Sequence, residues 1–326
     1  MAIETREDDV PVKTPLMERL GLERPVILAP MAFVSGGALA AAVGRAGGLG
    51  LIGGGYAEGD WVETQFAAAG NQPVGVGFIT WSLAKNPDLL RVALDHGPRA
   101  IFLSFGDVRP FAPAIAKAGV PLICQVQTLA DARVALGEGA AVLVAQGTEA
   151  GGHGSSRSTM ALVPEVVDAA GGVPVAAAGG IIDGRGLAAS LMLGAGGAVC
   201  GTAFFAASES LAHPNAKARV VGASGDETVR DSLFDVIRGR DWPPAYNIRT
   251  LRNSYHREWA GDTKRLQSQI EEQRHLYGLA NAAGDMDVEA TIIGEGVGLV
   301  HGIEPAEAIL DRMMTQATER LAAFAG

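Results

Sequence analysis

The sequence predicts an α/β fold, a TIM (βα)8 barrel with a helical subdomain inserted before the C-terminal helix. Short β-branched apolar runs alternate with Ala- and Leu-rich segments along the chain up to residue 205. The runs are apolar throughout, as in parallel strands whose outer face is covered by helices. Eight such runs precede residue 205, and eight units favour a closed barrel over an open doubly wound sheet.

The predicted strands and helices follow one another in the order that a barrel requires. The eight strands are expected at residues 25–29, 48–53, 73–79, 100–105, 120–125, 140–145, 173–178 and 197–200. Helical spacing of apolar residues indicates helices between them at 37–47, 88–97, 109–119, 128–139 and 184–194. Several of these segments finish on glycine, which readily adopts the left-handed conformation of a helix C-terminus.

The chain changes character after the eighth strand. Residues 206–290 are rich in Arg, Asn, Gln and Trp and look helical and polar, without clear strands. We expect them to form a helical subdomain beside the barrel mouth, either a lid or a homodimer interface. Residues 1–205 and 291–326 would then form the barrel, with the amphipathic stretch 304–326 as its eighth helix.

Composition excludes several classes of protein. Hydrophobic residues make up 48% of the chain and charged residues 19%, which predicts a large core. The net charge of −10 disfavours nucleic-acid binding. No apolar run approaches the roughly 18 residues of a membrane span, and "MAIETREDDV" does not resemble a signal peptide. Cys124 and Cys200 sit in apolar runs, so we expect buried reduced thiols, no metal site and a soluble cytoplasmic protein.

Two glycine-bearing loops predict a phosphate site. Gly179 and Gly180 follow the seventh predicted strand, and Gly201 and Thr202 follow the eighth. In this kind of barrel, the loops after these two strands often bind phosphate at the catalytic face. Glycine lets backbone N–H groups approach an oxyanion closely, and Thr202 adds a hydroxyl and can begin a short helix.

The stretch "AQGTEAGGHG" (145–154) follows the sixth predicted strand, so its polar side chains should lie beside the phosphate loops. Gln146 supplies an amide, while Gly151 turns the chain and exposes N–H groups. His153 should project over the barrel mouth, where an imidazole with an unperturbed pKa of about 6.5 suits proton abstraction. Glu149 is an alternative base, although we favour a structural role in which it accepts backbone hydrogen bonds.

Small and apolar residues follow the first and third strands. Pro30, Met31 and Ala32 can lie flat against an aromatic ring, and Gly77 allows close approach. Phe78 or Trp81 would supply a wall, and Gln125 ends the fifth strand as an amide in apolar company. A flat ring with hydrogen-bonding edges, together with a phosphate, indicates FMN.

Three of these motifs together resemble the nitronate monooxygenase family, the 2-nitropropane dioxygenase-like flavoproteins. The motifs are "QGTEAGGH", "PVAAAGGI" and "GTAFFAASES", and the likeness runs from "PVILAPM" to "GEGVGLVHG". The resemblance implies that His153 is the catalytic histidine. It also implies that FMN contacts Pro30, Met31, Ala32, Gln125, Gln146, Gly151, Ala178, Gly179, Gly180, Gly201 and Thr202. Gly154 stands where many members have Arg, and "GVGF" stands where relatives often have "GVNL", so Gly77 would contact FMN only through its backbone.

The resemblance also implies a reaction. An alkyl nitronate, propionate 3-nitronate in particular, would give one electron to FMN and form an anionic semiquinone. O2 then takes part in making a carbonyl compound and nitrite. His153 would hydrogen-bond the nitronate or remove the α-proton of a neutral nitroalkane.

Other activities remain open from the sequence. An FMN-dependent enoyl-thioester reductase resembles the same barrel and shares stretches like "EAGGH" and "GLGLIGGG", and NAD(P)H:quinone reduction is a third activity of related barrels. A flavin-free barrel acting on a sugar phosphate is the non-redox alternative. The chain lacks a Rossmann fingerprint, which mildly favours the oxygenase. Trp242, Tyr246, Tyr255 and Trp259 of the subdomain can serve packing or substrate contact.

Overall fold

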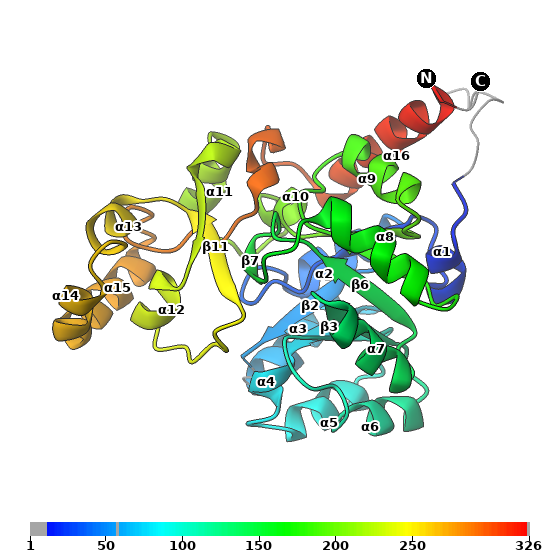
Figure 1. Cartoon of the computed structure of the whole chain (residues 1–326), viewed down its shortest axis with the longest axis horizontal. Helices are drawn as coiled ribbons and strands as arrows, with labels where there is room; N and C mark the ends of the chain where they lie inside the picture. The colour runs from blue at the N-terminus through cyan, green and yellow to red at the C-terminus, as the bar shows by residue number, and fades with distance from the viewer. Residues whose placement is uncertain (1–11, 57–58, 325–326) are drawn as a thin grey trace.

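A computed structural model describes residues 12–56 and 59–324, and its centre is an eight-stranded parallel β-barrel (Figure 1). All eight predicted strands are confirmed. They are β1 (Val26–Leu28), β2 (Leu51–Gly55), β3 (Gly75–Ile79), β4 (Ile101–Ser104), β5 (Leu122–Val126), β6 (Val142–Gln146), β8 (Val175–Ala178) and β9 (Gly197–Cys200).

The barrel closes between its first two strands. The strand order is β1-β9-β8-β6-β5-β4-β3-β2, with every neighbouring pair parallel. Leu49, just before β2, forms a parallel bridge with Ile27 of β1. Its carbonyl accepts from the Leu28 N–H at 2.9 Å, and its own N–H donates to the Val26 carbonyl at 3.0 Å. All eight strands therefore end at the same rim.

Helices surround the barrel, and the five predicted segments are confirmed with shorter ends. Around the barrel lie α1 (Pro15–Leu20), α2 (Gly37–Arg45), α3 (Gly59–Ala69), α4 (Thr80–Leu83), α5 (Asp88–Asp95), α6 (Ala112–Lys117), α7 (Leu129–Gly137), α8 (Thr159–Ala169), α9 (Gly184–Met192) and α10 (Thr202–Phe205). The predicted C-terminal helix is α16 (Ala306–Ala322), which packs against α9 and α2 as the last helix of the ring. Two sequence stretches extend beyond the described residues: "MAIETREDDV" and the last two residues of 304–326.

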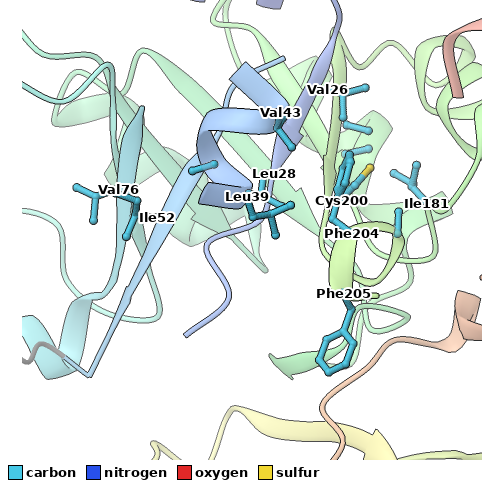
Figure 2. Close-up of a cluster of buried hydrophobic side chains, with 14 of the residues drawn as sticks. Val26, Leu28, Leu39, Val43, Ile52, Val76, Ile181, Cys200, Phe204 and Phe205 are labelled. Carbon is cyan, nitrogen blue, oxygen red and sulfur yellow. The ribbon is translucent and has the colours of Figure 1, made fainter. Parts of the chain in front are cut away.

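The core has two layers because alternate residues of each strand face opposite sides. Inward-facing residues such as Ile27, Phe102 and Val144 fill the barrel, and Leu16 of α1 packs with them. The other residues pack outward against the helices, as Val26, Leu28, Ile52 and Val76 do in Figure 2. The barrel is therefore a filled core, and an open space is left only where the inward side chains end.

The segment after the barrel strands contains a small antiparallel sheet, so the expectation that it has no strands was wrong. Strand β10 (Thr228–Asp231) pairs with β11 (Asn247–Leu251), and β11 pairs with β7 (Gly152–Gly154) of the loop after β6. The strands are short, and their partners are distant in sequence, so local patterning could not reveal them.

Helices of this segment lie to one side of the barrel in Figure 1. They are α11 (Pro214–Val221), α12 (Leu233–Ile237), α13 (Ser254–Trp259), α14 (Thr263–Ser268) and α15 (Ile270–Ala283), with 3-10 turns at Gly225–Glu227 and Glu295–Leu299. A separate small core forms here around Phe234, Tyr255, Trp259 and Tyr277. Tyr255 and Trp259 therefore serve packing.

The two cysteines are buried and unpaired, as predicted. Burial raises the pKa of each thiol to about 12, so both remain protonated near neutral pH. Within the described part of the chain, the helices are too short or too polar to cross a membrane.

Candidate active site

A cavity opens where the carboxyl ends of the barrel strands meet the small sheet. It encloses about 1230 Å³ of space between atoms, part of it open to solvent. The predicted catalytic histidine and all the residues expected to contact FMN through the family resemblance border it: Pro30, Met31, Ala32, Gly77, Gln125, Gln146, Gly151, His153, Ala178, Gly179, Gly180, Gly201 and Thr202. The loops after β6, β8 and β9 therefore converge on one rim of the barrel.

Strand periodicity explains why these positions converge. The inward-facing residues Ile123, Val144, Ala176 and Val199 belong to the barrel interior. Two residues further along each strand, the next inward positions are Gln125, Gln146, Ala178 and Gly201, which border the cavity. The next inward positions of these four strands thus form part of the cavity floor.

The loops after β8 and β9 carry backbone donors. Gly179 and Gly180 have φ angles of +114° and +73°, which side chains other than glycine rarely tolerate. Among the described residues, the N–H groups of Gly179, Gly180 and Gly201 donate no hydrogen bond. Thr202 begins α10, and its Oγ1 accepts from the Gly294 N–H at 2.9 Å. These N–H groups can bind an anion, as expected for a phosphate site.

The opposite wall is built from Pro30, Met31 and Ala32, which follow β1, and from Gly77 of β3. A Cβ at Gly77 would lie 2.4 Å from the Pro30 ring, so this position has room for backbone only. Of the two residues predicted to form a wall, Phe78 borders the cavity and Trp81 does not. The Trp81 ring packs edge-on against Trp242, with 5.3 Å between centroids.

Three glutamines form a connected group, and two of them, Gln125 and Gln146, border the cavity. Gln146 Oε1 accepts from Gln125 Nε2 at 3.1 Å and from Gln127 Nε2 at 2.9 Å. Gln146 Nε2 donates to the His153 carbonyl at 3.2 Å. The amides of β5 and β6 therefore fix the backbone of the histidine loop.

His153 lies on strand β7, and its side chain is paired with Asp235 of α12. Its Nε2 is 2.9 and 3.0 Å from the two Asp235 carboxylate oxygens. A carboxylate accepts the proton, so Nε2 carries it and Nδ1 keeps its lone pair. Nδ1 makes no hydrogen bond to any residue that the structure describes.

His153 does not project over the mouth as predicted, because Trp242 covers it. The two rings stack with centroids 3.3 Å apart and an interplanar angle of 8°, leaving the histidine 8% exposed. Burial lowers the pKa of His153, the Asp235 carboxylate opposes this, and the charges of Arg238 and Arg230 lower it further. The pKa lies below its usual 6.5, so the imidazole is neutral near pH 7.

The site also contains residues of the distant segment: Asp235 pairs with His153, Trp242 stacks on it, and Arg238 borders the cavity. No site role was predicted for Asp235 or Arg238. One signal was present: Asp235 stands in the apolar run "LFDVI". An acid in such a run is buried and needs a partner. The partner, 82 residues away, could not be read from the pattern.

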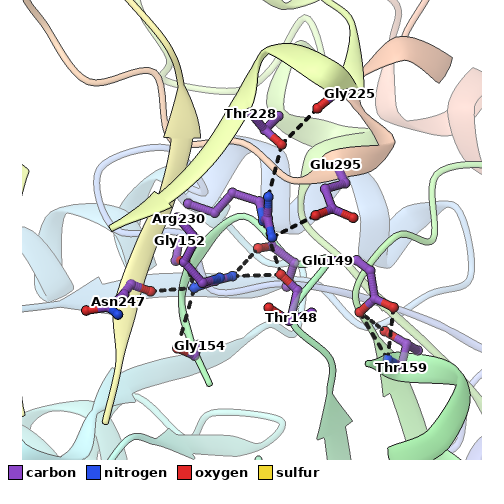
Figure 3. A network of polar contacts seen from close by, with 12 residues as sticks. Thr148, Glu149, Gly152, Gly154, Thr159, Gly225, Thr228, Arg230, Asn247 and Glu295 are labelled. Carbon is purple, nitrogen blue, oxygen red and sulfur yellow. Dashed lines mark hydrogen bonds and ion pairs between the residues drawn. The ribbon is translucent and has the colours of Figure 1, made fainter. Parts of the chain in front are cut away.

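Glu149 has the structural role that we favoured. Both of its carboxylate oxygens accept from the Thr159 N–H at 3.0 Å, and Oε2 also accepts from Thr159 Oγ1 at 2.7 Å. These bonds fasten the loop after β6 to the start of α8 (Figure 3). A carboxylate used in this way is a poor candidate for the base.

Two arginines of the small sheet hold the same loop from the other side (Figure 3). Arg230 donates to the carbonyls of Thr148, Ala150 and Gly152 at 3.0, 2.6 and 3.0 Å. Arg249 donates to the Thr148 carbonyl at 3.1 Å and pairs with Glu295 at 2.7 Å. The histidine loop is thus fixed by hydrogen bonds from residues distant in sequence.

Comparison with known proteins shows the family to which this chain belongs. The nitronate monooxygenase family model matches residues 13–79 and 79–316. Nitronate monooxygenase npaC of Metarhizium robertsii is 36% identical, with 90% of each chain covered.

Solved structures agree on the architecture. FabK from Thermotoga maritima superposes with a TM-score of 0.84 at 30% identity, covering 96% of this chain and 98% of that one. Nitroalkane oxidase from Streptomyces ansochromogenes superposes with a TM-score of 0.76 at 27% identity, covering 93% and 98%. The family model and the relatives cover most of the sequence, and the chain is an oxidoreductase that belongs to the nitronate monooxygenase family.

Proposed function

We propose that this chain is an FMN-dependent nitronate monooxygenase. It oxidises alkyl nitronates of the propionate 3-nitronate type with O2 and yields a carbonyl compound and nitrite. One observation carries the proposal: a single cavity joins backbone donors without protein acceptors, a flat apolar wall and a carboxylate-paired histidine.

The cavity residues fit FMN. The N–H groups of Gly179, Gly180 and Gly201 suit its phosphate. Pro30, Met31, Ala32 and Gly77 offer a flat surface for the ring system, and Gln125 offers an amide to its polar edge. When bound, FMN would accept electrons from the nitronate, chemistry that no side chain of the site supplies.

His153 handles the proton at the substrate carbon. Its neutral form has an unprotonated Nδ1, which accepts the α-proton of a nitroalkane, and the resulting imidazolium donates a hydrogen bond to the anionic nitronate. Asp235 holds the Nε2 proton in place throughout and stabilises the positive charge. Trp242, stacked on the ring, fixes its plane and excludes water from that face.

The segment 206–290 completes the site in this proposal. Arg238, Trp242 and Ile248 border the cavity from this segment, opposite the barrel strands. We propose that it serves as a wall over the substrate, attached to the barrel through β7.

Enoyl-thioester reduction is the second candidate, favoured by the structural likeness to FabK at a TM-score of 0.84. Anaerobic mixing separates the two functions. We expect propionate 3-nitronate to change the flavin absorbance of the purified holoenzyme within seconds, and NADH to leave it unchanged over the same interval. Reduction by NADH together with inertness toward the nitronate would assign the reductase function instead.

A further inference from the structure

Tyr56 directly follows β2 at the barrel rim and contacts the segment that covers His153. Its hydroxyl oxygen accepts a hydrogen bond from Trp242 Nε1 at 3.0 Å, although the two residues are 186 positions apart in the sequence. The Arg240 guanidinium lies over the Tyr56 ring, 4.0 Å from its centroid. Two side chains of the segment between α12 and β11 therefore hold a single residue of the rim.

The Trp242 indole contacts His153 through its face and other aromatic rings at steep angles. It stacks on the imidazole with 3.3 Å between centroids, and its planes make angles of 77° and 78° with Trp81 and Phe105. Aromatic pairs of this kind are stable over a range of geometries, so they do not fix one orientation. An indole has a single hydrogen-bond donor, Nε1–H. Its bond to Tyr56 is therefore the directional contact that sets how the indole lies.

The position of the indole affects the protonation of His153. Burial has the largest influence on the pKa of His153 and lowers it, the Asp235 carboxylate raises it, and the charges of Arg238 and Arg230 lower it further. Trp242 covers one face of the imidazole, so a displaced indole would admit water and stabilise the charged form. The pKa would then rise, and the neutral imidazole that accepts a proton would predominate only at higher pH.

We propose that Tyr56 is a positioning residue for His153 and acts through the Trp242 indole. Its hydroxyl holds the indole flat on the imidazole, so the rim at β2 and the segment after α12 together set the surroundings of the base. The consequence for turnover rests on the proposed function, whereas the stacking of the two rings is a property of the protein alone.

The kinetic test is a double-mutant cycle on the two halves of the hydrogen bond. Tyr56→Phe deletes the hydroxyl and keeps the ring under Arg240, and Trp242→Phe deletes the N–H and keeps an aromatic ring. In the otherwise wild-type enzyme, we expect Tyr56→Phe to lower kcat/KM for 1-nitropropane about 5-fold, the effect of losing one neutral hydrogen bond. In Trp242→Phe, the same change should have less than about a 1.5-fold effect, because the two residues act as one unit. The same loss in both backgrounds, or none in either, would overturn the proposal.

The pH profile separates positioning of the base from a general loss of structure. In Tyr56→Phe, the acid limb of kcat/KM should move to higher pH by about half a unit, a small part of the shift that full burial can cause. Tyr246→Phe is the matched control, because Tyr246 also packs edge-on against Trp242 at 6.5 Å but the indole donates its N–H to Tyr56. We expect the control to leave the profile unchanged. An unmoved acid limb in Tyr56→Phe, or an equal shift in Tyr246→Phe, would contradict the proposal.

A spectroscopic test needs no turnover and separates this inference from the proposed function. The ring protons of His153 lie against the face of the indole, which shields them, so their NMR resonances in the holoenzyme should lie upfield. Tyr56→Phe should move these resonances downfield, and Tyr246→Phe should leave them in place. If the wild type oxidises no nitroalkane, the proposed function fails, while the downfield movement still supports the positioning role. Resonances that stay in place in Tyr56→Phe would overturn the inference, whatever the activity.

Discussion

At the scale of single residues, the chemistry depends on which nitrogen of His153 carries its proton. The Asp235 carboxylate, at 2.9 Å, assigns that proton to Nε2. Asn at position 235 could donate an amide hydrogen to Nε2 and move the proton to Nδ1. The imidazole would then have no lone pair for the substrate, as happens when the aspartate of a catalytic triad is replaced by asparagine.

Asp235→Asn is therefore expected to slow turnover of 1-nitropropane by about 100-fold or more, within the usual range for a general base. Since the carboxylate raises the pKa of His153 against burial, its loss lowers that pKa further. The acid limb of the kcat/KM profile, which marks protonation of the base, should move to lower pH. Measuring kcat/KM between pH 5 and 8 checks both effects.

Two comparisons show whether Asp235 acts through the histidine. Propyl-1-nitronate is already deprotonated, so its turnover should fall much less than that of 1-nitropropane. His153→Asn should retain FMN and lose nitroalkane turnover to a similar extent. Equal losses for both substrates in Asp235→Asn, with an unshifted acid limb, would reduce Asp235 to a structural role.

Residue-level prediction succeeded where strand periodicity places a side chain. Gln125 and Gln146 end strands, so their inward direction follows from position alone. It failed for Asp235 and Arg238, because their positions depend on how a distant segment folds back over the rim. Phe105, a cavity residue, has a positive φ of 60°, which no sequence pattern of a non-glycine residue predicts.

At the scale of elements, the three-stranded sheet β10-β11-β7 joins the loop that carries His153 to the segment after the barrel strands. Ile248 of β11 stands opposite His153 in the register. The Arg230 side chain, from β10, binds three carbonyls of the loop at once. Burial lowers the pKa of Arg230 to about 10, so it remains charged near neutral pH. The histidine is thus positioned from outside the barrel.

Replacing Arg230 with Met should free the loop without unfolding the barrel, because the barrel strands and their core do not depend on it. We expect faster amide hydrogen exchange at residues 148–154 and a kcat lower by about 100-fold, since small displacements of a catalytic group have large effects. Arg91→Met is the matched control, because Arg91 is exposed and, among the residues that the structure describes, its side chain pairs with Asp95 alone. Unchanged exchange in Arg230→Met would contradict the positioning role.

At the scale of the whole molecule, the barrel was predictable because its signals are local. Continuous apolar runs and glycine-ended helices repeat along the chain, and each unit can be recognised alone. The small sheet was not predictable, because β7 is three residues long and pairs with a strand more than ninety residues later. Both parts border the cavity, and sequence patterns located the residues of its barrel side but did not reveal that Asp235 of the other part pairs with His153.

The central claim, that one rim holds FMN with its phosphate on the glycine loops, is tested most directly by comparing FMN with riboflavin, which lacks the phosphate. The measurement is a titration of the flavin-stripped protein with each compound. We predict FMN to bind at least about 100-fold more tightly, or about 2.8 kcal/mol, as two charge-assisted hydrogen bonds would provide. Equal affinities, or no binding of either flavin, would contradict the account.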